Sequence, residues 1–334
     1  MFIRYAGRAC LAMLSCVVAG TVLARAQNTT FDVPGASETY GLAINGSQVI
    51  AGYYTVGETY HSFVRAPDST ITPFDPAGAT QSYATAINGR GAIAGVFEDG
   101  NNVEHGYLRS SKGRIAQIDA PGSSCTAVMA ISGGSIAGFY CGDGGGAFLR
   151  TADGVFTTFG VPDALDTEAL CINADGVTAG EWVDPDEGFT HAFLRAVDGT
   201  LTTFDAPGAE STTVAGINNA GAIAGSFLDS NSEHGYIRAA DGTFTEFDPP
   251  QSTNTVVTAI DENGGIAGYY YNDFCATKGT ACAFSRSPDG TIRTFTVKNH
   301  YTVASGVAHV QDGGTAITGF WVEYGGLHGF VRTR

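Results

Sequence analysis

Residues that could do chemistry gather in one short stretch of the sequence, from Trp182 to His191. Asp184, Asp186 and Glu187 offer three carboxylates within four positions, close enough in sequence to serve as a general acid and base. Carboxylates on an exposed, charge-rich loop are usually only solvated. We therefore assign no catalytic residue here, and keep an extracellular hydrolase or lyase with its site on this loop as an alternative function.

The elements that must position this stretch are set by a repeat that covers Thr29 to Arg334. Its clearest marker is a tripeptide that ends in glycine, and the steps between successive glycines are 43, 43, 42, 45, 43 and 51 residues. An internal period of this size is typical of propellers and solenoids. The seven copies are Ile50–Gly52, Ile93–Gly95, Ile136–Gly138, Thr178–Gly180, Ile223–Gly225, Ile266–Gly268 and Ile317–Gly319.

A second marker falls in phase with the first. It is a tripeptide that ends in Phe or Tyr, with an arginine two residues later, and five of its seven copies begin with histidine. The histidines are His61, His105, His191, His234 and His328. The arginines are Arg65, Arg109, Arg150, Arg195, Arg238, Arg286 and Arg332.

Each repeat divides into four short strands separated by turn residues. In the fifth copy we predict strands over Thr212–Asn218, Ala222–Phe227, His234–Ala239 and Thr243–Asp248. High Gly, Thr, Val, Ile and aromatic content favours strands and tight turns over helices. Four strands at this period indicate an all-β fold of propeller blades.

The two ends of the repeat region complement each other. Thr29–Asp32 resembles a fourth strand that lacks a third, and His328–Arg334 resembles a third strand that lacks a fourth. Pairing the two would remove an open sheet edge. We therefore predict a seven-bladed β-propeller of four-stranded blades whose last blade is closed by the N-terminal strand. An open β-solenoid is the alternative, and it gives no reason for complementary ends.

The recurring Ile-Ala-Gly and His-Ala-Phe or His-Gly-Tyr elements resemble those of the HAF repeat family of bacterial exported proteins. The resemblance covers Thr29 to Arg334 and rests on seven in-phase copies. It implies an exported repeat protein and brings no catalytic residue to transfer. Gly146 and Cys282 stand where the tripeptide has histidine, so a histidine is not needed in every copy.

Residues shared by the copies are expected to solve the same packing problem in each blade. Close approach of one blade to the next would explain the strand glycines. A two-residue Asp198-Gly199 turn would place Phe193 opposite Phe204. The histidines begin the third strand, too far apart around a ring to share a metal ion, so we expect each to bond the aspartate of a nearby Phe-Asp-x-Pro loop, and we predict no metal site and no cofactor.

Function is expected where the copies differ, which is in the loops between the second and third strands. These loops are acidic and uneven in length, and aromatic residues border them. Binding residues tend to lie on loops held by a rigid scaffold, so we predict an exported, non-enzymatic binding protein for a glycan or a protein. A purely structural surface repeat protein is a further alternative. The candidate ligand-binding residues are Trp182, Asp184, Asp186, Glu187, Trp321 and Tyr324.

The charge of the chain excludes some partners. There are 33 acidic and 17 basic residues, and the formal net charge is −16. Nucleic acids and anionic membranes require clustered Lys and Arg, so neither is expected as a partner. We expect a monomer that its charge keeps soluble.

The first 26 residues have the pattern of a cleaved signal peptide. Arg4 and Arg8 precede an apolar run that ends in the small-x-small sequence Ala24-Arg25-Ala26. We therefore predict a signal peptide over residues 1–26 and a single propeller domain over residues 27–334, secreted to the periplasm or the medium. No later stretch is long and apolar enough to span a membrane.

Cysteine usage fits an oxidising compartment. Cys275 and Cys282 flank one short loop and are predicted to form a disulfide. Cys125 and Cys141 lie symmetrically about the turn near Gly133 and are predicted to form a cross-strand disulfide. Cys171 is left as a small buried residue.

Overall fold

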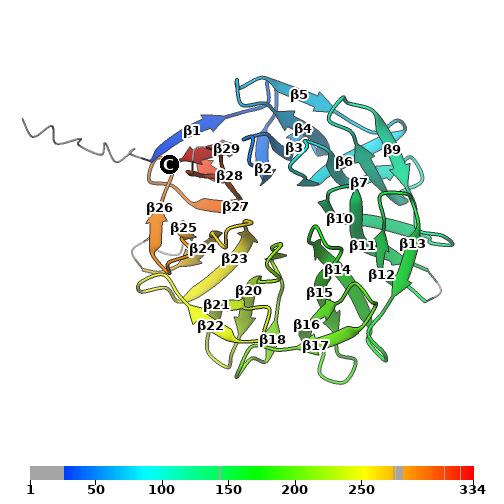
Figure 1. Cartoon of the computed structure of the whole chain (residues 1–334). Coiled ribbons are helices and arrows are strands. Elements are labelled where there is room, and N and C mark those ends of the chain that lie inside the picture. Colours follow the sequence, from blue (N-terminus) through cyan, green and yellow to red (C-terminus); the bar gives the residue numbers. More distant parts are fainter. Residues whose placement is uncertain (1–25, 143, 274, 276–280, 312, 324) are drawn as a thin grey trace, which may run out of the picture.

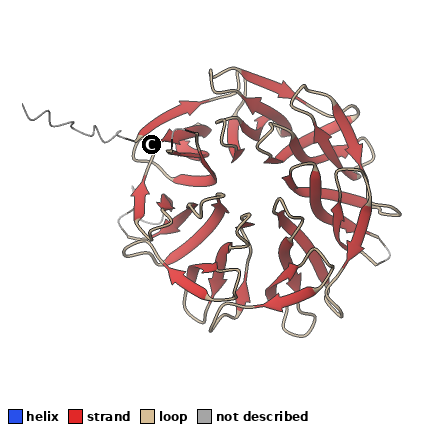
Figure 2. Cartoon of the chain, viewed as in Figure 1, coloured by secondary structure: helices blue, strands red, loops and turns tan. Residues whose placement is uncertain are grey.

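A computed structural model shows the chain as a ring of seven antiparallel sheets around a central axis (Figure 1). It describes residues 26–334 except 143, 274, 276–280, 312 and 324. The described residues form strands, turns and loops but no helix (Figure 2), so none of them forms a helix that could cross a membrane. The predicted seven-bladed, all-β propeller is confirmed.

The blades follow each other in chain order, each with its first strand nearest the axis (Figure 1). Blade 1 contains β2 (Glu38–Ile44), β3 (Ile50–Val56), β4 (Thr59–Arg65) and β5 (Ile71–Phe74). Blade 2 contains β6 (Ala79–Ile87), β7 (Ile93–Asp99), β8 (Glu104–Arg109) and β9 (Ile115–Ile118). Blade 3 contains β10 (Cys125–Ser132), β11 (Ser135–Cys141), β12 (Gly146–Arg150) and β13 (Phe156–Phe159). Blade 4 contains β14 (Asp166–Ile172), β15 (Thr178–Val183), β16 (Thr190–Arg195) and β17 (Leu201–Phe204).

The remaining blades keep this pattern with two variations: the first strand of blade 5 is split in two, and the fourth strand of blade 7 comes from the N-terminus. Blade 5 contains β18 (Ser211–Thr212), β19 (Gly216–Ile217), β20 (Ile223–Leu228), β21 (Glu233–Arg238) and β22 (Phe244–Phe247). Blade 6 contains β23 (Asn254–Ile260), β24 (Ile266–Tyr271), β25 (Ala281–Arg286) and β26 (Ile292–Phe295). Blade 7 contains β27 (Thr302–His309), β28 (Thr315–Glu323), β29 (Gly326–Thr333) and β1 (Gln27–Phe31).

The N-terminal strand closes the ring as predicted. β1 pairs antiparallel with β29, from Gln27 opposite Thr333 to Phe31 opposite Gly329. The ring has two faces, which we name by their connections. The loop face carries the connections between second and third strands and between blades, and the turn face carries the other two kinds of connection.

The first strand of blade 5 is split, which differs from the continuous strand predicted over Thr212–Asn218. The backbone N–H of Val214 donates to the side chain of Glu181 at 2.8 Å and not to the neighbouring strand. Between β18 and β19 the N–H groups of Thr213 and Ala215 still donate to β20, at Ser226 O and Ala224 O, so the split is a local irregularity in a paired strand.

The strand glycines are needed inside a blade, which corrects the prediction of contact between blades. A Cβ on Gly52 would lie 1.9 Å from the carbonyl oxygen of Tyr40 in the adjacent strand of the same blade. A register shift between Gly41 and Ala43, a β-bulge, brings that carbonyl close. The glycines of the other six copies face the same clash, at 1.9–2.2 Å.

The predicted pairing of Phe193 with Phe204 is wrong by one residue. Phe204 pairs with Ala192, because the hairpin closes with Ala196 N–H donating to Thr200 O and so has a three-residue loop. The ring of Phe193 packs instead against Phe159 of the preceding blade, with centroids 5.9 Å apart. The aromatic pairs therefore fill the gaps between blades.

The repeated arginines also pack in the gaps between blades. In six blades the guanidinium lies over the fourth-strand aromatic ring of the preceding blade, 4.3–5.1 Å from its centroid. In blade 3 it lies over Phe156 of its own blade at 5.6 Å, because the preceding blade offers Ile118 there. Stacking of this kind stabilises a partly buried cation.

Both predicted cysteine pairs are placed for disulfides. Cys125 and Cys141 lie opposite each other on β10 and β11, with Cα atoms 4.9 Å apart and a bond between their sulfurs. Cys275 and Cys282 have Cα atoms 5.5 Å apart, within the range for a disulfide. Cys171 is buried with a free thiol, as predicted.

Candidate functional site

The repeated histidines form structural contacts. Each Nδ1 lies next to a carboxylate oxygen of the aspartate that follows the fourth strand of the same blade, which confirms the predicted bond. The distances are 2.9 Å for His61–Asp75, 2.7 Å for His105–Asp119, 3.0 Å for His191–Asp205, 2.7 Å for His234–Asp248 and 2.9 Å for His328–Asp32. Each imidazole also packs on a second-strand aromatic ring, with centroids 4.8–5.4 Å apart.

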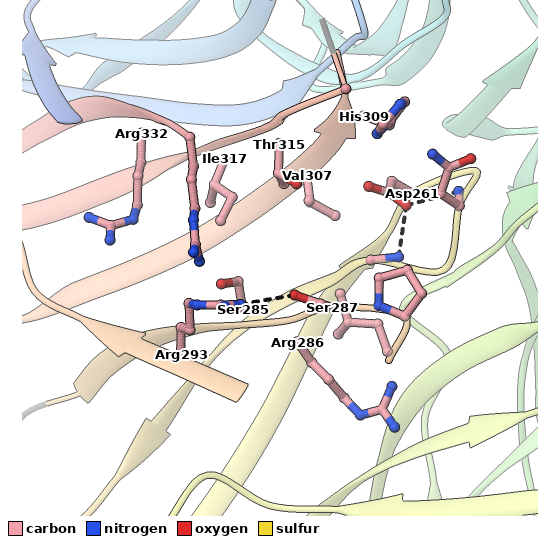
Figure 3. A pocket seen from close by; sticks show the side chains of 16 residues that line it. Asp261, Ser285, Arg286, Ser287, Arg293, Val307, His309, Thr315, Ile317 and Arg332 are labelled. Carbon is pink, nitrogen blue, oxygen red and sulfur yellow. Dashed lines mark hydrogen bonds between the residues drawn. The ribbon is translucent and has the colours of Figure 1, made fainter. Parts of the chain in front are cut away.

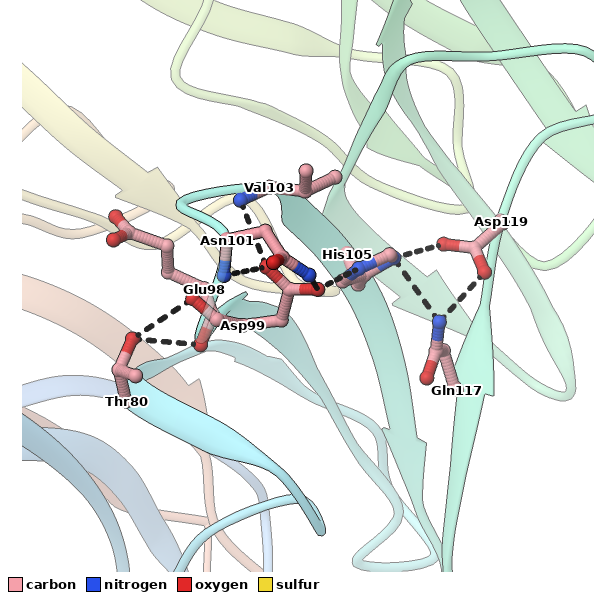
Figure 4. A network of polar contacts seen from close by, with 8 residues as sticks. All are labelled: Thr80, Glu98, Asp99, Asn101, Val103, His105, Gln117 and Asp119. Atoms are coloured by element: carbon pink, nitrogen blue, oxygen red, sulfur yellow. Dashed lines mark hydrogen bonds and ion pairs between the residues drawn. The ribbon is translucent and has the colours of Figure 1, made fainter.

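Blade 2 shows how such a histidine is held (Figure 4). Asp119 accepts from His105 Nδ1, and Asp99 lies 3.7 Å from its Nε2. Asp99 Oδ1 in turn accepts the N–H groups of Asn101 and Val103 and so shapes the loop. These bonds to the carboxylate lower the pKa of Asp99. The network therefore holds His105 and the loop from Asp99 to Val103 in place.

One described group of side chains has the spacing of metal ligands. His234, Glu246 and Asp248 each offer a ligand atom, and these atoms lie within 4.8 Å of one another. The pair of His234 and Asp248 is the contact seen in four other blades, and Thr255 Oγ1 donates to the same carboxylate. The trio is therefore the blade 5 version of the histidine contact with one extra glutamate.

The predicted acidic loop of blade 4 is exposed, and its first carboxylate shapes a turn. Asp184 Oδ1 accepts the N–H groups of Asp186 and Glu187 at 2.7 and 3.0 Å. These bonds lower the pKa of Asp184, which makes its carboxyl a poor proton donor near neutral pH. Asp186 and Glu187 are exposed. His191 is bonded to Asp205, so no acid–base pair forms on this loop.

The predicted aromatic binding residues do not form one surface. Trp182 is half-buried and stacks on His191, with centroids 4.8 Å apart. Trp321 is 1% exposed in the core of blade 7, between His328 and Lys298, so its prediction as a ligand contact is wrong. The physical reason is that it serves as the ring on which the histidine of its blade packs. Tyr324 lies outside the described residues.

A cluster of tyrosines lies on the loop face of blades 1 and 2. We call Tyr40, Tyr53, Tyr60 and Tyr83 the tyrosine cluster; all four are partly exposed. Their ring centroids lie 4.4–5.7 Å apart, with Tyr40 and Tyr53 stacked across β2 and β3. Tyr40 and Tyr83 lie on β2 and β6, the innermost strands of their blades (Figure 1), so this side of the cluster borders the axis.

Polar groups hold the hydroxyls of this cluster. Tyr40 Oη donates to Glu38 at 2.9 Å, and Tyr83 Oη donates to Gln81 at 3.1 Å. Gln81 is held in turn by Glu98 through a 2.8 Å bond. Burial raises the pKa of Tyr53 and of Tyr83 to about 12, and it also raises the pKa of Tyr40, so these three hydroxyls carry no phenolate charge at neutral pH. The arrangement presents neutral aromatic faces beside carboxylates.

A pair of glutamates occupies the matching positions in blade 4. Glu168 and Glu181 lie directly opposite each other on β14 and β15, where like charges repel. Burial raises the pKa of Glu181 to about 7, and the charge of Glu168 adds to the rise against the bond from Val214. Burial also raises the pKa of Glu168, helped by Asp166. Protonation of one carboxyl group, or binding of one cation between them, would remove the repulsion between Glu168 and Glu181.

Sequence reasoning missed both groups, although a signal was present. Tyr53 and Glu181 each follow the invariant strand glycine directly, and across the seven blades this position holds Tyr, Val, Phe, Glu or Ser. The other blades have Val96, Phe139, Ser226, Tyr269 and Phe320 there. The residue after the invariant glycine is therefore a position at which the blades differ in chemistry, and this variation was the signal for both groups.

The fold has relatives among solved structures. A streptogramin B lyase is 15% identical, with a TM-score of 0.57, over 92% of this chain and 98% of that one. Virginiamycin B lyase from Staphylococcus aureus is 13% identical, with a TM-score of 0.60, over 92% and 99%. TolB from Acinetobacter baumannii is 16% identical, with a TM-score of 0.51, over 77% and 62%. At these identities the likeness shows a shared propeller fold. No family model and no curated protein matches the chain.

Proposed function

We propose that the chain is an exported, non-enzymatic binding protein that holds a basic segment of a protein partner on the tyrosine cluster. The observation that carries this proposal is the cluster itself, four partly exposed rings with centroids 4.4–5.7 Å apart on the loop face. Aromatic faces attract Lys and Arg side chains, and tyrosine is enriched in protein interfaces.

Charge supports a cationic partner over a neutral one. Glu38 and Glu98 border the tyrosine cluster and already accept bonds from Tyr40 and Gln81. The chain has a formal net charge of −16, which would steer a basic segment toward it. Such steering weakens with salt, because surface charges are screened within about 10 Å at 0.1 M ionic strength.

A peptide-binding titration tests the proposal. The ligand is a labelled ten-residue peptide rich in Lys and Arg, and its Gln-substituted copy is the ligand control. We expect Tyr60→Ala to weaken binding of the basic peptide about five- to thirtyfold, which corresponds to the loss of about one to two kcal/mol from one cation–π contact. Tyr140→Ala, in blade 3 and outside the cluster, should leave binding unchanged.

Two results would overturn the basic-partner proposal. If the Gln-substituted peptide binds as well as the basic one, charge does not select the partner. If a neutral oligosaccharide binds and Tyr60→Ala removes that binding, the cluster is a glycan site, the other partner class predicted from the sequence.

The glutamate pair of blade 4 favours a second candidate function, an extracellular hydrolase or lyase. A carboxyl with a pKa of about 7 can act as a general acid or base near neutral pH. Glu181 is partly exposed on the loop face, so a substrate proton could reach it. Turnover of an extracellular polymer that Glu181→Gln abolishes and Glu187→Gln leaves unchanged would establish this function. Equal turnover in both variants would exclude Glu181 as the acid or base.

The proposal includes export of the protein, which is also what the HAF repeat resemblance implies. The signal-like segment over residues 1–26 supports export, and so does the bonded pair of Cys125 and Cys141, since disulfides persist in oxidising compartments. Mass spectrometry of the protein recovered from the native host tests this directly. A mature N-terminus at Gln27 is expected, and retention of residues 1–26 in the cytoplasm would contradict it.

A further inference from the structure

A pocket of about 240 Å³ opens on the turn face between blades 6 and 7 (Figure 3). Ser285, Ser287 and Arg293 line it from blade 6, and His309, Thr315 and Arg334 line it from blade 7. Its volume lies below the roughly 300–1,000 Å³ of sites for drug-sized ligands. The pocket is therefore suited to a small group.

Blade 7 supplies one wall of the pocket because its hairpin is longer than the others. In blade 1 the pair Ile44–Ile50 is the last before the turn, and the matching pair in blade 7 is Val307–Ile317. Blade 7 continues for two more pairs, which end at His309 opposite Thr315. Arg334 extends this wall, since its backbone exchanges two hydrogen bonds with Thr315.

Blade 6 opens the pocket by departing from the repeat at two facing positions. Ser285 pairs with Arg293 across β25 and β26. In the six other blades the first of these positions holds a branched aliphatic residue and the second holds Thr or Ala. The equivalent pairs are Val64–Thr72, Leu108–Ala116, Leu149–Thr157, Leu194–Thr202, Ile237–Thr245 and Val331–Thr29.

These two departures change both the space and the charge. Leu194 and Ile237, at the position of Ser285, pack against the hydrophobic clusters of their blades. A serine leaves that volume open, and an arginine faces it. Both changes occur in the same pair, which forms part of the pocket lining.

The two pocket arginines form no ion pair with a side-chain carboxylate among the described residues. The charge of Arg293 still reaches Asp289 in the adjacent turn, where it adds to the lowering of that carboxyl's pKa by its bonds to Thr291. Among the described residues, no side-chain carboxylate oxygen lies within 4.0 Å of the Arg293 or Arg334 guanidinium, and Arg293 donates only to Ser287 Oγ, at 3.1 Å. The α-carboxylate of Arg334 is engaged on the blade 7 wall, where its oxygen accepts the N–H of Thr315. Asp261 is the one carboxylate side chain among the described lining residues, and it already accepts the N–H groups of Asn263 and Gly265. Arg334 is close enough that its charge helps to lower the pKa of Arg332, second to burial.

Two further arginines at the pocket belong to the blade interfaces. Arg286 lies over Phe247, and Arg332 lies over Phe295 and donates to Asn28. Both are copies of the repeated arginine, and Figure 3 shows their guanidinium groups directed away from Ser285 and Thr315. The arginines that are special to this pocket are Arg293 and Arg334.

We propose that this pocket binds a small tetrahedral oxyanion, a phosphate or sulfate group, between Arg293 and Arg334. Guanidinium groups present planar pairs of N–H donors that match such oxygens. The hydroxyls of Ser285 and Ser287 supply further donors from the same wall. The site lies on the turn face, so it is independent of the binding proposed for the loop face.

Calorimetric titration with inorganic phosphate and with sulfate, at constant ionic strength in chloride, tests this site. We expect one saturable site, and the ratio of the two dissociation constants distinguishes a phosphate site from a sulfate site. Arg293→Thr restores the residue of five other blades and so should fold, and we expect it to weaken binding at least tenfold. Arg114→Thr removes an exposed arginine of blade 2 and should change nothing.

A second variant tests whether binding needs the open volume of the pocket as well as the charge of Arg293. Ser285→Leu restores the aliphatic residue of the other blades while Arg293 stays, and we expect it to block binding without lowering the melting temperature in chloride. Absence of saturable binding by either anion would overturn the proposal. So would equal affinities for the wild type and for Arg293→Thr when both have the same melting temperature in chloride.

Discussion

Replacing Glu181 by glutamine should make the protein more stable, and the gain should depend on pH. Burial raises the pKa of Glu181 from 4.5 to about 7 in the folded protein. An acid with a raised folded-state pKa binds its proton more tightly when folded. Its favourable contribution is therefore present below about pH 4.5 and is lost as pH rises through about 7.

The size of the effect follows from the shift. A difference of about 2.5 pKa units at about 1.36 kcal/mol per unit amounts to about 3 kcal/mol at pH 8. Glu181→Gln keeps an oxygen to accept the Val214 N–H, which is bonded at 2.8 Å, and removes the charge. We expect the variant to unfold with a free energy up to about 3 kcal/mol larger than that of the wild type at pH 8, and with little difference at pH 4.5.

Urea unfolding of both proteins across this pH range measures the difference directly. Glu187→Gln is the matched control, because Glu187 is exposed on the same blade. A stability difference that is the same at pH 4.5 and pH 8 would refute the burial argument. So would a variant that is less stable than the wild type at pH 8 while the control is unaffected.

Three further predictions concern the scaffold. Gly138→Ala should cost several kcal/mol or prevent folding, because its Cβ would lie 1.9 Å from the Ala127 carbonyl oxygen. Gly89→Ala is the control and should change the melting temperature little, because a Cβ there meets nothing within 4 Å. Equal melting temperatures for the two variants would contradict the clash. Phe193→Ala should lower the free energy of unfolding by about 3–5 kcal/mol in urea titrations, since the ring is 0% exposed between blades, and a loss under 1 kcal/mol would show that the gap collapses. Cys125→Ser should cost about 3 kcal/mol, the value for closing a loop of this length, and the variant should lose the sensitivity to reductant that calorimetry is expected to show for the wild type.

The architecture could be predicted because each blade solves the same packing problem. Seven in-phase copies gave the blade count, and the complementary ends gave the pairing of β1 with β29. The contact between histidine and aspartate could be predicted for the same reason, since both residues recur at fixed spacing in five blades. Repetition within one chain therefore carries information about contacts inside a blade.

The register and the site could not be predicted in the same way. Asp198-Gly199 is compatible with a two-residue or a three-residue loop, and the difference moves Phe204 from Phe193 to Ala192. Trp321 looked like a loop aromatic, but its exposure depends on His328 and Lys298 packing around it. The tyrosine cluster joins residues of two blades, and the oxyanion pocket joins two more, so neither lies within one repeat.

Closure of the ring has a consequence for how the protein comes apart. In an open repeat array, the end units contact a neighbour on one side only and fray first. Here β1 completes blade 7 beside β29, so every blade packs between two others and none is a terminal unit. Loss of any one blade opens two interfaces at once, and all but the interface between blades 2 and 3 hold a stacked arginine. The seven blades should therefore melt in a single cooperative transition, with the seam between β1 and β29 as the one place where the ring can open without breaking the chain.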